Sequence, residues 1–486
     1  MACWRLPSPW RSKGVTDHRL PSTHRSRTVS SDLAAYVRSN RERFEQEFVD
    51  FLRIPSVSTE KRYAADVARC AEWLAENIRE AGMDNVEIIS TEGNPFVVAE
   101  KIVDPDAPTV LVYGHYDVQP VDPEELWDAP PFEPTFVNGR IYARGTNDDK
   151  GQVLMHVKAL ETRLKGGFGM PINVKLCIEG EEEIGSINLE TFLRSAADRL
   201  ACDAVIVSDT GMLGIDIPSI GTGLRGIAYL EVFVDGPAGD LHSGSYGGAV
   251  VNPAFALAQI ISQLKDEDGR VTIPGFYDRV RPISESIREE TRALPYTDED
   301  FLEETGAPSL GGEAGYSTLE RLWYRPCLDV NGMISGFTGD GAKTVLPAKA
   351  SAKISMRLVA DQDPDEIAEL FTNHVMSLAP EGVTVRVVPS HGGWPWAGDP
   401  DSPLFEAAAQ ALEEAFGRRP VYIGEGGSIP IIPLFEEVLK GPVLLLGFAP
   451  PGGNAHAPNE WMDVETYHKG IETIARLYDG VAERGI

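Results

Sequence analysis

The chain has 486 residues, with 74 acidic against 44 basic side chains and a formal net charge of -30. Such an acidic surface repels the phosphates of nucleic acids and anionic membranes, so we expect neither as a partner. The five cysteines are scattered without a C-x-x-C pair, which argues against a disulfide framework or a thiolate zinc site and favours the reducing cytoplasm. The length predicts two domains and a tail.

Residues 1–30 differ in charge from the rest of the chain, because they contain six basic residues and one acid, Asp17. Enrichment in Ser and Arg is typical of an organellar transit segment, but these residues have neither a convincing amphipathic helix nor the apolar stretch of a secretion signal. We therefore expect a disordered basic extension. Nowhere does the chain contain the run of ~18 apolar residues that a membrane-spanning helix needs.

Helices and strands alternate over residues 31–221. We expect helices at 33–52, 66–81 and 152–164, and strands at 97–102, 110–113, 173–178 and 204–207. Gly82 is the expected end of the second helix. This alternation predicts an α/β domain with a mixed, largely parallel sheet and flanking helices.

A different pattern occupies residues 222–392. Strands are expected at 227–234, 328–335, 350–359 and 383–388, and two helices, 253–264 and 364–378, begin at Asn-Pro and Asp-Pro pairs. Strand, helix, strand, strand, helix, strand is the order of a ferredoxin-like α+β domain. A segment rich in proline and charge, 274–326, interrupts this order and has no predicted structure.

The α/β pattern returns over residues 393–486, with helices expected at 403–416 and 464–478 and a strand at 443–446. The smaller domain is therefore predicted to be inserted between the two parts of the larger one.

The clearest candidate site begins at the end of the buried strand 110–113. Gly114 follows, and then His115 and Asp117 leave the carboxyl end of the strand, where open α/β sheets bind their ligands. Two positions apart in an extended segment, these side chains share a face, so the carboxylate can hold one imidazole nitrogen while the other faces a metal. Alone, the triplet fits a solvated strand end equally well.

Acidic and imidazole side chains follow other predicted strands. Asp148 and Asp149 precede the helix 152–164, three glutamates, 181–183, follow the strand 173–178, Asp209 follows the strand 204–207, and His456 follows the strand 443–446. Each alone also fits a charged turn or a solvated surface. Together, mixed imidazole and carboxylate ligands suit zinc, with manganese or cobalt as competitors. The acids exceed the needs of one metal, which favours two metals and a bridging carboxylate.

In this order the motifs resemble those of the co-catalytic zinc metallopeptidases that include aminoacylase, carboxypeptidase G and the cytosolic non-specific dipeptidases, and the carnosinase-like dipeptidase branch fits best. The resemblance runs from about residue 31 to the end. It rests on His115-x-Asp117, Asn147-Asp148-Asp149-Lys150-Gly151, Glu181-Glu182-Glu183, Ser208-Asp209 and His456, with support from residues 240–248, 341–345, 356–358 and 425–430.

The resemblance implies a zinc-exopeptidase-type catalytic domain with an inserted ferredoxin-like lid and dimerisation domain. It assigns His115 and Asp209 to one divalent metal, Glu183 and His456 to a second, and Asp148 to both. Asp117 would orient His115, and Glu182 would be the general base that takes a proton from the metal-bridging water. Three consecutive glutamates occur where the family pattern has one acidic pair, and alignment on Gly185-Ser186 selects Glu182 and Glu183.

Further roles are implied around the substrate. His242 of one subunit would reach the active site of its partner in a homodimer formed through the lid. Arg357 would bind the substrate carboxylate, because Ile354, Met356 and Leu358 alternate with it and face the other way. The remaining predicted substrate contacts are Thr344, Asn331 and Ser428. The sequence departs from the carnosinase-like pattern at Trp396, where those relatives carry a histidine nearby.

We therefore predict a cytoplasmic, homodimeric metallopeptidase that hydrolyses the peptide bond of dipeptides with a free carboxylate. One alternative within the family is a deacylase or desuccinylase of N-acyl amino acids. An alternative of another class is a non-catalytic metal-binding homologue.

Overall fold

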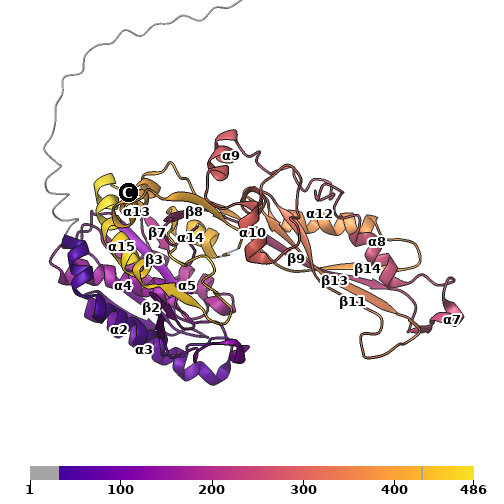
Figure 1. Ribbon diagram of the computed structural model, residues 1–486, viewed down its shortest axis with the longest axis horizontal. Coiled ribbons are helices and arrows are strands. Elements are labelled where there is room, and N and C mark those ends of the chain that lie inside the picture. The colour runs from indigo at the N-terminus through magenta and orange to yellow at the C-terminus, as the bar shows by residue number, and fades with distance from the viewer. Residues whose placement is uncertain (1–31, 428, 430) are drawn as a thin grey trace, which may run out of the picture.

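The computed structural model describes residues 32–427, 429 and 431–486 (Figure 1). The predicted basic extension, residues 1–30, lies outside the described residues. Two separate hydrophobic cores correspond to a large α/β domain and a smaller sheet domain beside it. Within the described residues, no helix combines the length and apolar character needed to cross a bilayer.

The large domain is built on a mixed sheet that has nine strands among the described residues. Strand β3 lies between β6 and β7 and is parallel to both, and β17 is parallel to β7, so these strands end at one edge of the sheet. In sheet order the strands are β1 (Asp84–Ile89), β2 (Phe96–Lys101), β6 (Asn173–Glu179), β3 (Thr109–His115), β7 (Ala204–Val207), β17 (Val443–Leu445), β8 (Ser219–Leu224) and β15 (Trp396–Ala397), with β16 (Val421–Glu425) paired to β8.

Helices cover this sheet (Figure 1). Their bounds are α2 (Arg41–Leu52), α3 (Ala64–Ala81), α4 (Lys150–Lys165), α5 (Leu189–Ser195), α6 (Ala197–Leu200), α13 (Pro403–Phe416), α14 (Ile431–Leu439) and α15 (Val464–Arg484). Gly82 ends α3 with a left-handed φ of 102°, as its position predicts. Helix α4 contacts both α3 and α15 and is buried from Lys150 to Arg163, so its amino end is held rigidly.

Shorter elements surround the edge where the strands end. A second sheet joins β4 (Thr135–Val137), β5 (Arg140–Tyr142) and β18 (Trp461–Asp463). Single 3-10 turns span Lys61–Tyr63, Glu124–Leu126 and Glu182–Ile184. The last of these carries two of the three consecutive glutamates.

The smaller domain contains the antiparallel sheet β11 (Cys327–Ser335), β13 (Lys349–Leu358), β9 (Gly226–Asp235) and β14 (Thr384–Gly393), in that order. Helices α8 (Pro253–Ile261) and α12 (Pro364–Ser377) belong to its core. Numbered along the chain, the strand order is 2-3-1-4, which is the ferredoxin-like arrangement. At the tip farthest from the large domain lie β10 (Leu241–His242), α7 (Ser243–Tyr246) and β12 (Val345–Leu346) (Figure 1).

The charged segment 274–326 forms three helices near the junction of the two domains, α9 (Glu285–Arg292), α10 (Asp298–Thr305) and α11 (Thr318–Trp323). Ion pairs to two buried carboxylates fix its path, since Arg325 lies 2.8 Å from Glu313 and Arg288 lies 2.8 Å from Glu320. The chain crosses from β8 to β9 at Arg225 and returns between β14 and β15. These crossings touch, because a Cβ atom on Gly226 would lie 2.6 Å from the carbonyl oxygen of Gly393.

Candidate metal centre

Strand β3 ends at His115, whose side chain is completely buried. Its Nδ1 lies 3.1 Å from the backbone carbonyl oxygen of Asp117 and 3.4 Å from Oδ1 of the same residue. The opposite nitrogen, Nε2, is buried and forms no well-aligned hydrogen bond within the described residues, but it faces the carboxylates of Asp148 and Asp209 at 3.1 and 3.8 Å. A buried imidazole that is oriented through Nδ1 and has Nε2 available for coordination has the arrangement of a metal ligand.

Asp148 lies between the two histidines. Its Oδ1 is 3.1 Å from Nε2 of His115, and its Oδ2 is 2.9 Å from Nε2 of His456. Two sets of ligand atoms meet at this carboxylate, His115 with Asp209 and Glu183 with His456, and within each set the atoms lie within 4.8 Å of one another. The residues that the sequence assigns to two metals are therefore brought together with Asp148 in common.

Asp117 connects the first histidine to the glutamate turn. Its carboxylate oxygens accept hydrogen bonds from the backbone N–H groups of Glu182 and Glu183, each at 3.2 Å. Glu183 then presents Oε2 to His456 at 3.2 Å and accepts a hydrogen bond of 2.7 Å from Gln119. One buried carboxylate thus orients parts of both ligand sets.

Glu182 points its carboxyl group into the same acidic environment. Burial, together with the neighbouring charges of Asp209 and Glu183, raises the pKa of this group to about 9 against the opposing effect of His115. The pKa of His456 is also raised, to about 10, because its imidazole forms hydrogen bonds to Asp148 and Glu183. Such crowding of carboxylates around protonated histidines is the charge pattern that divalent cations replace.

Glu181 lies outside this group. Its carboxylate accepts hydrogen bonds from the backbone N–H of Asn94 at 2.9 Å and from the side chain of Asn188 at 2.7 Å. The Glu181 side chain is buried among these contacts. The structure therefore separates the three consecutive glutamates, with Glu183 among the metal-ligand candidates and Glu181 in a structural role.

A residue that sequence reasoning missed, Glu460, shapes the loop that carries Asp148. It is completely buried, and its carboxylate accepts hydrogen bonds of 2.8 Å from the backbone N–H groups of Gly145 and Asn147 and of 3.2 Å from that of Asp148. Arg144 adds an ion pair of 2.8 Å. Its position four residues after His456 is the only sequence signal that links it to the site.

Glu425 is a second residue without an assigned role. Its carboxyl group accepts a hydrogen bond of 3.4 Å from the backbone N–H of Gly211, two residues after Asp209. Burial raises its pKa to about 7, and the charge of Asp209 contributes. It thus adds an acidic group beside the first ligand set.

The residues predicted to contact substrate do not gather at the metal ligands within this subunit. His242 is exposed at the distal tip, where its Nδ1 accepts a hydrogen bond from the Gly244 N–H. Thr344 lies nearby, because its carbonyl oxygen accepts a hydrogen bond of 3.1 Å from the backbone N–H of Ser243. Asn331 is exposed at the irregularity of β11. Ser428 lies outside the described residues.

Arg357 and Trp396 both lie near the domain junction. Arg357 is half-buried on β13, opposite Cys327 and Ile227, and its charge lowers the pKa of buried Arg225, for which burial is the larger cause. Trp396 is buried on β15 and donates a hydrogen bond of 2.9 Å from Nε1 to Glu436.

A match to the model of peptidase family M20/M25/M40 extends over residues 111–479, so the chain belongs to this family. It is 34% identical over 435 residues to the Cys-Gly metallodipeptidase dug1 of Schizosaccharomyces pombe, covering 86% of this chain and 91% of that protein.

Two solved structures agree in fold. The dipeptidase Dug1p of Saccharomyces cerevisiae matches with a TM-score of 0.78 and 30% identity, covering 93% of this chain and 98% of that one. Human carnosine dipeptidase 1 matches with a TM-score of 0.79 and 28% identity, covering 94% and 99%. The predicted family and fold class are confirmed.

Glu460 provides a test of how the bridging loop is held. Glu460→Gln replaces an acceptor of several N–H groups by an amide that turns donors toward Arg144, so we expect roughly 10-fold to 100-fold weaker metal binding, the usual effect of removing such outer contacts. Isothermal titration with Zn²⁺ measures it, and Glu483→Gln, on the exposed end of α15, is the matched control. Unchanged affinity in Glu460→Gln would contradict this role.

Proposed function

We propose that this protein is a dipeptidase that uses two divalent metal ions to hydrolyse the peptide bond of substrates with a free carboxylate. The observation that carries the proposal is the sharing of Asp148 between two ligand sets, His115 with Asp209 and Glu183 with His456. The naming of its relatives as metallodipeptidases supports the same activity. No predicted ligand is replaced in this sequence, which argues against a non-catalytic homologue.

The donor set fits such ions. Each set offers one imidazole and one carboxylate besides Asp148, and mixed ligands of this kind suit zinc first and manganese or cobalt next. When bound, the ions would lower the pKa of a water molecule and polarise the scissile carbonyl. Glu182, beside Glu183 but in neither ligand set, would take the proton from the attacking water and pass it to the leaving amine.

The charges around the site favour dipeptides over N-acyl amino acids. Glu425 supplies a half-buried carboxyl group beside Asp209, which suits the free ammonium of a dipeptide, and an N-acyl amino acid has no such cation. At the other end of the substrate, Arg357 and Arg225 form a cationic spot where the two domains meet. A guanidinium binds a carboxylate with paired hydrogen bonds.

We further propose that the protein is a cytoplasmic homodimer assembled through the lid. The exposed tip that carries His242 lies far from the metal ligands of its own subunit (Figure 1). If the tip reached the active site of the second subunit in a dimer, His242 could contact the substrate bound there. The cysteines at positions 70, 177, 202 and 327 are free thiols, in keeping with a reducing compartment.

A substrate panel tests the activity directly. With Zn²⁺, Mn²⁺ or Co²⁺ added, free dipeptides should be cleaved at least about 10-fold faster, by kcat/KM, than N-acetyl or N-succinyl amino acids of the same carboxyl-terminal residue, because one ionic contact of about 1.4 kcal/mol is a factor of ten. Amino acid release is followed by chromatography. Faster turnover of the acylated compounds would instead favour a deacylase.

The role of Glu182 can be separated from that of its neighbours. Glu182→Gln should keep both metals and lower kcat by roughly 100-fold or more, the scale of general-base catalysis. Glu181→Gln is the matched control, since that side chain holds Asn94 and Asn188, and its kcat should change far less. Metal content is measured by mass spectrometry; loss of metal from Glu182→Gln would assign that residue to the ligands.

The proposed carboxylate contact predicts a substrate-dependent loss. Arg357→Met should lower kcat/KM by about two to three decades for free dipeptides, on the basis of ~2 to 5 kcal/mol for a lost buried charge contact. The same peptides amidated at the carboxyl end should be affected much less. Lys353→Met, at an exposed position of the same strand, is the control. Equal losses on both substrates would make Arg357 a structural residue.

The trans role of His242 predicts recovery of activity on mixing. His242→Ala and Glu182→Gln subunits are each impaired, but a mixed dimer has one site in which both groups are intact. After subunit exchange, verified by native mass spectrometry, activity should rise well above that of either variant alone. Absence of any rise in verified mixed dimers would contradict the trans role.

A further inference from the structure

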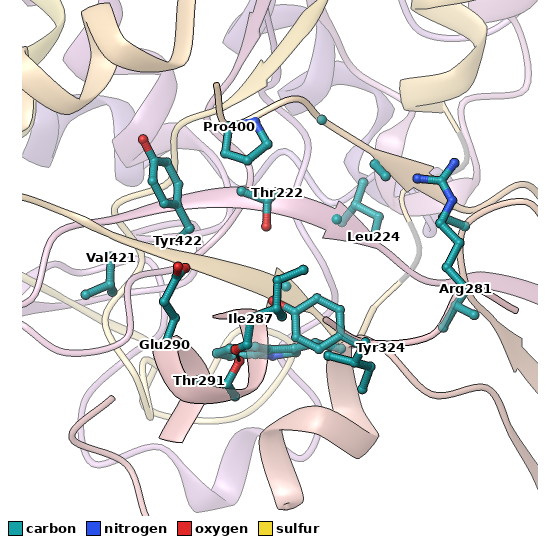
Figure 2. Close-up of a pocket in the computed structure, with 18 of the residues that line it drawn as sticks. Thr222, Leu224, Arg281, Ile287, Glu290, Thr291, Tyr324, Pro400, Val421 and Tyr422 are labelled. Atoms are coloured by element: carbon teal, nitrogen blue, oxygen red, sulfur yellow. Dashed lines mark hydrogen bonds between the residues drawn. The ribbon is translucent and has the colours of Figure 1, made fainter. Parts of the chain in front are cut away.

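A cavity of about 530 Å³ lies at the junction of the two domains (Figure 2). Its upper wall comes from β8 and β16 of the catalytic domain and includes Thr222, Leu224 and Tyr422. Its lower wall comes from α9, with Ile287, and from the end of α11, where Tyr324 follows the helix. The volume falls within the few hundred to about a thousand cubic ångströms typical of small-molecule sites, which occur preferentially at domain interfaces.

The cavity is distinct from the metal centre. Among the described residues that line it, none is a candidate metal ligand. It also reaches the lid through Val359 and Ala360, which follow β13. A molecule bound there would contact the catalytic domain, the segment 274–326 and the lid at once.

Its walls are aromatic and well anchored. Trp396 is held by its hydrogen bond to Glu436. Trp323 packs against the backbone of β16 so closely that a Cβ atom on Gly424 would lie 2.6 Å from Cβ of the tryptophan. With Tyr324 and Tyr422, these rings offer flat apolar surfaces whose faces also attract cations.

The charges lining the cavity are unbalanced toward the negative. Arg281, at the rim, is paired with both carboxylate oxygens of Asp361. The carboxylate of Glu290, on α9, has neither a hydrogen bond nor an ion pair within the described part of the chain, and it projects among the lining residues (Figure 2). An anionic group beside aromatic rings selects against anionic ligands.

We propose that this cavity binds a small molecule with an aromatic or branched apolar body and one protonated amine. The apolar body would lie between Ile287 and Leu224, and the amine would face Glu290. Since the ligand would contact both domains, its binding would favour the domain arrangement seen here over others, which makes the cavity a regulatory site separate from the reaction.

Calorimetric titration of the zinc-loaded protein with 2-phenylethylamine and 3-phenylpropionate tests this proposal, because the two probes share a phenyl body and differ in charge. The amine should bind roughly 5-fold to 10-fold more tightly, since one exposed carboxylate contributes a modest effect. Glu290→Gln should remove that difference. Equal binding of both probes to the unaltered protein, or preference for the acid, would overturn the proposed amine selectivity.

Filling the cavity distinguishes this site from any binding near the metals. Ile287→Trp, at a partly exposed lining position of α9, should weaken binding of the amine at least 10-fold without changing metal content, and Leu294→Trp is a second variant that fills the same space. Metal content serves as the check on the catalytic domain and does not depend on the proposed activity. Unchanged binding in either folded variant would overturn the location.

Discussion

The structure depends on one constraint, the crowding of buried carboxylates around two imidazoles at one edge of the sheet. Asp148 stands between His115 and His456, at 3.1 and 2.9 Å. Asp209 and Glu183 add further negative charge within the same sets. Without cations these acids repel one another, and burial together with Asp148 raises the pKa of Asp209 and Glu183. The proposed pair of divalent ions would relieve that repulsion, so the same carboxylates would account for both the local structure and the chemistry of this edge.

Two other carboxylates hold the loops in place. Asp117 accepts N–H bonds from the glutamate turn while it borders Nδ1 of His115, and Glu460 accepts N–H bonds from the loop of Asp148. Each couples chain segments that are distant in sequence. Buried polar contacts therefore set the positions of the candidate ligands and of the proposed base, Glu182, on a scaffold of strands and α4 whose residues are almost completely buried.

Much of this arrangement could be predicted from the sequence, for physical reasons. Fully buried strands appear as short apolar runs, and parallel strands bring their carboxyl ends together, so His115, Asp148, Asp209 and the glutamates could be grouped in advance. Alignment on Gly185-Ser186 separates Glu181 from its two neighbours, and the hydrogen bonds of Glu181 to Asn94 and Asn188 agree with that choice. The role of Glu460 could not be predicted, because its hydrogen-bond partners lie more than 300 positions away in the sequence. The assigned roles in catalysis stay predictions.

The parts that could not be predicted lie where the two domains meet. Strands β8 and β16 contain glycines, and β15 has only two residues, so periodicity gives little signal for them. Helices α9 and α11 depend on ion pairs such as Arg288 with Glu320 and on Trp323 packing against Gly424. These contacts join residues far apart in the sequence, which local periodicity does not reveal.

The proposed mechanism requires that Asp148 bind two metal ions at once. Diffraction at the zinc absorption edge from crystals of the zinc-loaded protein measures this most directly. We expect two anomalous peaks per chain, each beside one carboxylate oxygen of Asp148, with His115 at one peak and His456 at the other. A single peak, or two peaks that leave Asp148 uncoordinated, would contradict it.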